Sequence, residues 1–255
     1  FALVRALAKR RVESWIGPVV QLRKKLGLPA SATNPVLEGF SPFGTLALFS
    51  PRFASPQPDW PALTRVCGLV FYDKRDSQTT HDAGLDEFLK AGPPPVLFTL
   101  GSSAVMHPGK FYEKSIAAAH EVGARAVLLA GDFTPEKSFG NIYAANYAPY
   151  SEIMPHVAVS VHSGGMGTCA QALTAGRPML VVPWSHDQPD NAERLRKLGV
   201  SRTIARSRYT GARAARELNR LLDESSYQRA AAEIARQVAA EDGLRAACDT
   251  LEELV

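Results

Sequence analysis

Short apolar runs alternate with amphipathic segments from residue 85 onward. The apolar runs predict buried strands, and the segments between them, where apolar residues recur at helical spacing, predict helices. We expect strands at 95–100, 126–130, 141–145, 157–162, 179–182 and 202–205, and helices at 85–90, 110–122, 169–175, 190–198 and 210–222. Strands that alternate with helices are typical of an α/β fold with a doubly wound parallel sheet.

The two ends of the chain follow other patterns. Helical spacing over residues 2–26 is interrupted at Gly17-Pro18, which predicts two helices. Apolar runs further on predict strands at 45–50 and 65–71, separated by a segment with four prolines. From Ser225 to the end the spacing is helical, and Gly243 separates two predicted helices.

Composition and charge narrow the class of protein. The chain has 255 residues, of which 45% are hydrophobic and 21% charged, as in an ordinary globular protein. The net charge of +4 is mild; it is compatible with an anionic ligand or simply with a slightly basic surface. No block of Lys and Arg is interleaved with aromatic residues, so we do not expect nucleic-acid binding.

The three cysteines, Cys67, Cys169 and Cys248, are far apart and odd in number. They form no CxxC pair and have no histidine at metal-ligand spacing, so we expect reduced thiols in a cytoplasmic protein and no metal site. No apolar run is long enough for a membrane span, and no signal peptide is visible. The chain starts at Phe1 inside a helical pattern, which suggests a fragment.

The most informative stretch is Val157–Asn191. An apolar run is followed by the glycine-rich turn 163–168, a small-residue helix and a second apolar strand. In this βαβ order anions bind at the helix N-terminus, where backbone amides lack helical partners and glycines permit close approach. The alternative is a tight turn without a ligand. The turn matches neither GxGxxG nor a P-loop, so a magnesium-bound nucleoside triphosphate is not expected.

Two other polar turns directly follow predicted strands. Gly101-Ser102 follows the strand at 95–100, and Asp187-Gln188 follows the strand at 179–182. In a parallel sheet these turns and the glycine-rich turn lie on the same edge, where ligands bind. The sequence therefore predicts one crevice lined by all three turns.

Three segments together resemble a known family. The segment HSGGMGTCAQALTAGRPMLVVPWSHDQPDNAERLRKLGV (162–200), the segment LFTLGSS (97–103) and the segment NYAPYSEIMPHVAVSVHSGG (146–165) are similar to the donor-binding part of GT-B fold glycosyltransferases. These enzymes are of the UDP-glycosyltransferase type and include bacterial macrolide and sterol glycosyltransferases. An opening segment, from WIGPVVQLRKKLGLP (15–29) through LALFSPRFASPQPDWP (46–61) to GLVFYD (68–73), resembles the end of the family's N-terminal domain and its linker. The resemblance therefore covers nearly all of the chain. It implies the end of an N-terminal acceptor domain at 1–72, a linker and first helix at 73–92, a Rossmann-like nucleotide-sugar donor domain at 93–240 and a C-terminal helix at 241–255.

The resemblance also implies residue roles. The donor diphosphate would be held by the amides of Gly164, Gly165, Gly167 and Thr168, with Ser102, Ser163 and His162 nearby. The base and ribose would contact Tyr147, Ala148 and Gln171, and the sugar would contact Asp187, Gln188 and His186. Trp184 either walls the sugar pocket or packs in the interior.

Two positions depart from the family pattern. Many members have a histidine where this chain has Ser163, and a ribose-binding glutamate where it has Gln171. Either His162 substitutes for the missing histidine or its ring points into the sheet. The sequence therefore does not determine which nucleotide is bound, and only the family resemblance favours UDP over TDP.

The implied reaction is transfer of a sugar from a nucleotide diphosphate to a small-molecule hydroxyl, with inversion. It needs no metal and no cofactor beyond the nucleotide-sugar. The family's catalytic base is a histidine near the start of the N-terminal domain, and this chain shows no candidate for it, so no catalytic residue is expected here. The alternative is a nucleotide-sugar binding module that needs a separate acceptor-domain chain. A GT-B sugar epimerase is a third possibility, which predicts more carboxylates in the crevice.

Overall fold

The computed structural model describes residues 10–12, 15–29, 40–71, 82–101, 106–131 and 138–253. The chain forms two compact units that interleave in sequence. The first comprises Phe1–Ala47, Pro56–Arg65 and Asp249–Val255, and the second comprises Leu48–Ser55 and Val66–Cys248. The predicted boundaries at residues 72, 92 and 240 stay a prediction.

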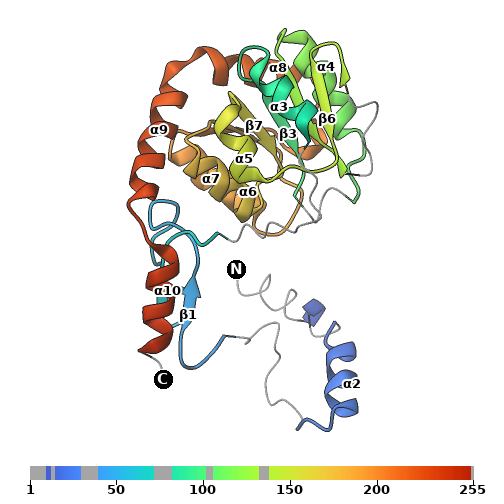
Figure 1. Cartoon of the computed structure of the whole chain (residues 1–255). Coiled ribbons are helices and arrows are strands. Elements are labelled where there is room, and N and C mark those ends of the chain that lie inside the picture. Colours follow the sequence, from blue (N-terminus) through green and yellow to red (C-terminus); the bar gives the residue numbers. More distant parts are fainter. Residues whose placement is uncertain are drawn as a thin grey trace. The chain divides into compact units, whose positions relative to one another are not determined.

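The second unit contains a seven-stranded sheet with the order β5-β6-β4-β3-β7-β8-β9 (Figure 1). Its strands are β3 (Val96–Thr99), β4 (Ala126–Leu129), β5 (Ser138–Phe139), β6 (Ile142–Ala145), β7 (Val159–His162), β8 (Met179–Val181) and β9 (Ser201–Thr203). All neighbouring strands are parallel except β5, which runs antiparallel to β6. The predicted doubly wound parallel sheet is thus confirmed.

The strand order has a direct consequence for ligand binding. The first parallel strand, β3, lies in the middle, and the chain winds outward through β4 and β6 before it returns to β7 on the other side of β3. The crossovers therefore reverse direction between β3 and β7. A crevice opens at this switch point, beyond the carboxyl ends of the two strands.

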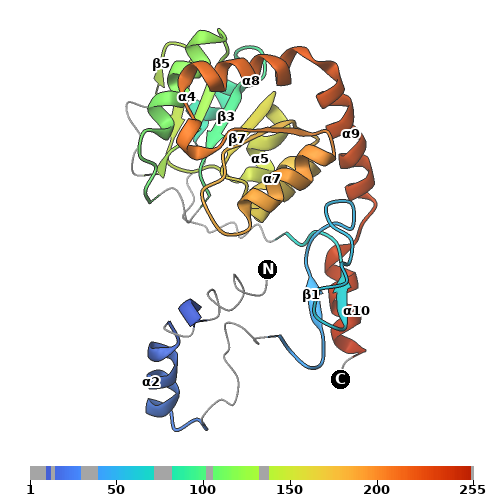
Figure 2. The same cartoon turned by 180° about the vertical axis from the view of Figure 1, so that it is seen from behind.

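Helices cover both faces of the sheet, which explains why its strands are apolar throughout. On one face α4 (Phe111–Glu121) and α8 (Gly211–Asp223) pack on each other, as the view from behind shows (Figure 2). Their buried side chains, Phe111 and Leu218 among them, join Phe98 and Val161 of the sheet in one core.

The opposite face carries α5 (Tyr150–Ile153), α6 (Met166–Thr174) and α7 (Gln188–Lys197) (Figure 1). The long helix α9 (Ser225–Ala239) packs against α6, and α3 (Ala83–Lys90) packs against β6. Short 3-10 turns lie at Met154–His156 and Arg206–Arg208, and the helix α10 (Gly243–Glu252) follows α9.

Two helices begin earlier than their sequence pattern predicts. We expected a helix from Cys169, but α6 starts at Met166, because Gly165 has extended N-cap geometry and Gly167 is accommodated inside the first turn. Likewise α7 starts at Gln188 rather than at residue 190, with Pro189 in its first turn, a position where proline is well tolerated. Both shifts move helix N-termini toward the predicted crevice.

The described part of the first unit is small. It contains α2 (Gly17–Lys25), which follows the predicted interruption, and the strands β1 (Thr45–Ala47) and β2 (Thr64–Val66), which form a two-stranded sheet. Both strands are shorter than predicted. A turn at Ser50–Phe53 ends the first apolar run, and Gly68, with a φ of 111°, interrupts the second.

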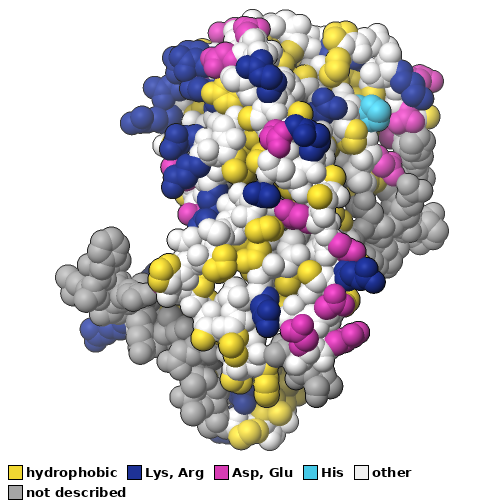
Figure 3. All heavy atoms as spheres, turned by 90° about the vertical axis from the view of Figure 1, so that its left-hand side faces the viewer, with side chains coloured by type: hydrophobic (Ala, Val, Ile, Leu, Met, Phe, Trp, Pro, Cys, Tyr) yellow, Lys and Arg dark blue, Asp and Glu magenta, His cyan; other side chains and the backbone are white. Residues whose placement is uncertain are grey.

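The charged surface is mixed on the face shown in Figure 3, where basic and acidic side chains are interspersed. Ion pairs within single helices join Arg194 with Asp190 on α7 and Arg236 with Glu233 on α9. None of the helices in the described ranges is long and apolar enough to cross a lipid bilayer.

Candidate functional site

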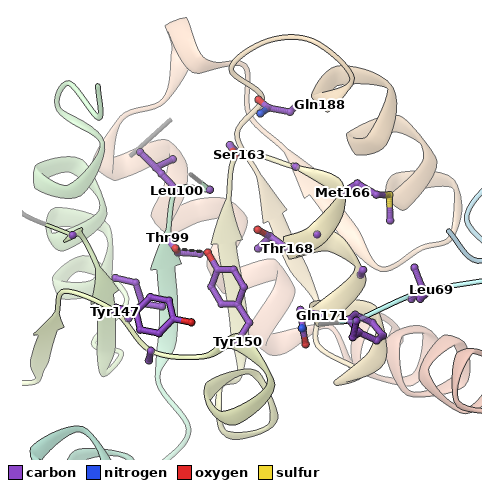
Figure 4. A pocket seen from close by; sticks show the side chains of 18 of the residues that line it. Leu69, Thr99, Leu100, Tyr147, Tyr150, Ser163, Met166, Thr168, Gln171 and Gln188 are labelled. Carbon is purple, nitrogen blue, oxygen red and sulfur yellow. Dashed lines mark hydrogen bonds between the residues drawn. The ribbon is translucent and has the colours of Figure 1, made fainter. Parts of the chain in front are cut away.

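A cavity of about 790 Å³ lies at the switch point of the sheet. Its walls come from the end of β3 (Thr99–Gly101), the segment after β6 (Asn146–Ala148 and Tyr150) and the glycine loop with the start of α6 (Ser163 and 165–168). Gln171 and Gln188 complete the polar lining (Figure 4). A cavity of this size accommodates a ligand larger than a single phosphate or sugar.

The N-terminus of α6 opens into this cavity. Gly165 is the N-cap, and no side chain caps the helix. The first helical hydrogen bond runs from the Cys169 amide to the Gly165 carbonyl at 3.0 Å, so the amides of Met166, Gly167 and Thr168 have no partner within the helix. Added Cβ atoms on Gly165 and Gly167 would meet nothing within 4 Å. The helix dipole and these accessible amides favour an anionic group at this position.

Both backbone polar groups of Gly164 are engaged in hydrogen bonds. Its amide donates to Nδ1 of His162 at 3.1 Å, and its carbonyl accepts from Nδ2 of Asn191 at 2.9 Å. Its φ is 89°, and a Cβ would lie 2.7 Å from Cγ1 of Val181. Because its amide is already engaged with His162, Gly164 shapes the loop, and the expected phosphate contact from this amide stays a prediction.

His162 is fully buried at the end of β7. Burial lowers the pKa of its imidazole from 6.5 to about 4, so the ring is neutral near pH 7. The ring does not line the cavity and cannot offset the charge of a phosphate. Of the two alternatives for His162, the structure supports the ring that points into the interior, and the cavity lining gives no support to the expected phosphate contact.

The residues expected near the base and ribose do line the cavity. Tyr147 is 63% exposed, Ala148 is at the edge of the interior, and Gln171 projects from the second turn of α6. Figure 4 shows the two tyrosines after β6 facing the side chains of α6. Tyr150 and Thr99, whose hydroxyls are 2.9 Å apart, were missed by the sequence analysis, although both lie in segments that carry the family resemblance.

The two residues of the Asp-Gln pair expected at the sugar lie in different environments. Gln188 is 5% exposed and lines the cavity, and its Oε1 accepts from the amides of Trp184 at 2.7 Å and Ser185 at 3.0 Å. Asp187 is exposed and lies outside the cavity lining, and its Oδ2 accepts from Nδ2 of Asn191 at 2.7 Å. The buried amide thus fixes the loop while the carboxylate faces solvent.

His186 and Trp184 do not line the cavity either. His186 is exposed with a φ of 57°, and its Nδ1 lies 2.7 Å from Oγ of Ser185. Trp184 packs edge-on against Phe111, with ring centroids 5.6 Å apart, and lies under the Arg206 guanidinium. Of the two alternatives for Trp184, packing is the one that the structure supports.

Ser163 is 2% exposed and lines the cavity, as does Thr168. Ser102 lies outside the described residues, whereas its neighbour Gly101 lines the cavity close to Ser163 and Thr168. The apolar part of the lining is unexpected. Part of it comes from Leu48 and residues 69–71, which were expected to belong to the end of an N-terminal domain.

A doubly wound sheet with a glycine loop and a large cavity at its switch point defines the Rossmann-like class of nucleotide-binding domains. Residues 134–254 match the family described as "Erythromycin biosynthesis protein CIII-like, C-terminal domain". The chain is 34% identical over 239 residues to O-mycaminosyltylonolide 6-deoxyallosyltransferase of Streptomyces fradiae, covering 92% of this chain and 56% of that enzyme.

Solved structures show the same fold. The glycotransferase of kitacinnamycin superposes with a TM-score of 0.69 at 24% identity, covering 98% of this chain and 62% of that one. The glycosyltransferase VinC, solved in complex with dTDP, gives a TM-score of 0.62 at 24% identity, covering 93% and 58%. These comparisons confirm the resemblance expected from the sequence: the chain is similar to the C-terminal part of macrolide glycosyltransferases and has the fold of the GT-B glycosyltransferases. It spans only 56% of the curated relative's length.

Proposed function

We propose that this chain binds a nucleotide diphosphate-sugar, and that the enzyme to which it contributes transfers the sugar to a hydroxyl of a small-molecule acceptor. The observation that carries the proposal is the row of helix-terminal amides from Met166 to Thr168, which opens into a cavity of about 790 Å³. The pyrophosphate occupies this helix N-terminus. The base then extends toward Tyr147 and Gln171, and the sugar toward Gln188 and Asp187.

The same amides also stabilise the leaving nucleotide diphosphate. When the glycosidic bond breaks, negative charge grows on the nucleotide diphosphate, and preorganised amide donors stabilise that charge without reorganisation. The reaction then requires neither a metal nor a further cofactor. It proceeds with inversion, because the acceptor hydroxyl attacks the anomeric carbon on the face opposite to the leaving diphosphate.

A general base must remove the proton of the acceptor hydroxyl. His162 is buried and engaged with Gly164, so it is not available for this task. We assign the base, and most of the acceptor pocket, to the part of the related enzymes that this chain does not span. This chain alone, mixed with donor and a panel of phenolic and macrolide acceptors, should show no efficient turnover. Efficient turnover would contradict the assignment.

The nucleotide is UDP in our proposal, with dTDP as the competing candidate. The choice of UDP is based on the family resemblance. The neutral Gln171 beside the expected ribose position and the dTDP complex of VinC are compatible with a deoxyribose instead. Calorimetric titration of this chain with UDP, UDP-glucose, dTDP and dTDP-glucose compares the four ligands directly. Failure to bind any nucleotide diphosphate would overturn the donor site.

The second candidate is a nucleotide-sugar binding module without catalysis of its own, acting with a separate acceptor-domain chain. The same titrations constrain it when they are repeated with Asp187→Ala. A loss of affinity for the sugar nucleotide but not for the free nucleotide supports a sugar-binding role for Asp187 in either candidate. Equal affinities in wild type and variant contradict that role. Turnover restored by adding a complementary N-terminal chain would favour the module.

A further inference from the structure

One side chain connects the glycine loop to the aspartate expected at the sugar. Asn191 lies one turn after Asp187 in α7 and is 5% exposed. Its Nδ2 donates to the Gly164 carbonyl at 2.9 Å and to Oδ2 of Asp187 at 2.7 Å. Both hydrogens of the carboxamide are therefore engaged, one on each of two segments that are far apart in the sequence and adjacent in the structure.

The glycine side of this connection is rigid. The bond from its amide to His162 holds the Gly164 backbone, which has a φ of 89° and lies where Val181 leaves no room for a Cβ. The Gly164 carbonyl consequently presents a fixed acceptor to Asn191. A continuous hydrogen-bonded path then runs from His162 through Gly164 and Asn191 to Asp187.

The aspartate side has no such support of its own. Asp187 is exposed, and its carboxylate does not cap α7. An exposed carboxylate samples several rotamers, and binding a sugar hydroxyl would have to remove that freedom. A hydrogen bond from a buried, already fixed amide removes it before the ligand arrives.

We propose that Asn191 is a positioning residue that holds Asp187 at a set distance from the diphosphate-binding loop, so that the affinity for the sugar depends on Asn191 through Asp187. This inference rests on the proposed function. It assigns Asn191 no contact with the donor. Asn191 is suited to the task because its Nδ2 faces two acceptors; an aspartate there would place its own charge against a carbonyl and a second carboxylate.

The test is a double-mutant cycle on this chain, with UDP and UDP-glucose, and dTDP and dTDP-glucose, as probes in calorimetry. Asn191→Ala should weaken the sugar nucleotide about tenfold, in the range of a hydrogen bond to a charged group. It should change the free nucleotide much less, because the bond to His162 still holds Gly164. Asp187→Ala should show the same split, and the double variant should lose no more than Asp187→Ala alone, since the two residues act in series.

The matched control is Asp190→Asn, which removes a carboxylate from the same turn of α7. Asp190 pairs outward with Arg194 at 2.6 Å, so this variant should bind both ligands as wild type does. Asn191→Asp should weaken the sugar nucleotide more than Asn191→Ala does. The positioning role would be overturned if the fold losses in affinity of the two single variants multiplied in the double variant. Equal losses of affinity for the sugar nucleotide and the free nucleotide would also overturn it.

A ligand-free measurement separates this inference from the proposed function. The side-chain rotamers of Asp187, followed by NMR of the ligand-free chain, should become more mixed in Asn191→Ala and stay unchanged in Asp190→Asn, because only the first variant removes the bond to Oδ2 of Asp187. If wild type binds neither probe, the proposed function fails and the sugar role of Asn191 fails with it, while the rotamer result still reports on the connection. If wild type binds both and the Asp187 rotamers are unchanged in Asn191→Ala, the inference alone is overturned.

Discussion

The imidazole of His162 accepts a hydrogen bond from the amide of Gly164, two residues further along the chain, at 3.1 Å. This acceptor role requires Nδ1 to be unprotonated. The ring is fully buried, and burial lowers its pKa from 6.5 to about 4. A structural hydrogen bond of the glycine loop therefore depends on the charge state of a buried histidine.

The first prediction concerns the dependence of stability on pH. The unfolded chain takes up a proton at His162 below pH 6.5, and the folded chain does so only near pH 4. Because the unfolded state binds more protons in that window, the contribution of His162 to the free energy of unfolding falls as pH drops from 6.5 to 4. It falls by about 3 kcal/mol at pH 4. Urea denaturation at several pH values measures it.

The control for this prediction is His162→Asn, which keeps a hydrogen-bonding amide but does not titrate. The unfolding free energy of wild type minus that of the variant should be constant above pH 7. It should decrease as the pH falls toward 4. A difference that is independent of pH would show that His162 is not held neutral by the fold.

The second prediction concerns Gly164→Ala. The left-handed φ and a Cβ placed 2.7 Å from Cγ1 of Val181 both disfavour alanine. Together they should reduce the free energy of unfolding by about 2–4 kcal/mol. Gly165→Ala is the matched control, because its φ is −62° and a Cβ there meets nothing within 4 Å. Equal stabilities of the two variants would contradict the account of the loop.

The third prediction concerns Tyr147, which is 63% exposed at the cavity wall. If the base stacks on this ring, Tyr147→Ala should weaken UDP or dTDP by about 1–3 kcal/mol without loss of thermal stability. Tyr147→Phe keeps the ring and should bind as wild type does. A loss in the Phe variant equal to that in the Ala variant would assign the contact to the hydroxyl instead of the ring.

The fourth prediction concerns Gln171→Glu. A carboxylate accepts hydrogen bonds from two ribose hydroxyls, whereas deoxyribose offers one fewer donor. The substitution should therefore raise the affinity for UDP relative to dTDP, by about tenfold for one charged hydrogen bond. Competition titration gives the ratio in each protein. An unchanged ratio would remove Gln171 from the ribose site.

The alternation of apolar runs with helical spacing was enough to predict the sheet, its parallel strands and the edge that carries the crevice. These features depend on local periodicity and on the rule that strand ends share an edge, so a linear sequence contains them. The same holds for Ser163, Gly165, Gly167 and Thr168, which line the cavity because they directly follow a strand in the chain.

Burial and contacts between distant residues could not be obtained in this way. The sequence around His162 does not distinguish a ring that faces a ligand from one that is buried in the interior, because adjacent strand positions face opposite sides. The use of the Gly164 amide, the packing of Trp184 on Phe111 and the lining from residues 69–71 each depend on segments that meet only after the sheet is assembled. The order of strands and helices therefore follows from the local sequence pattern. Whether a given polar group faces a ligand or the interior is decided by packing across the sheet.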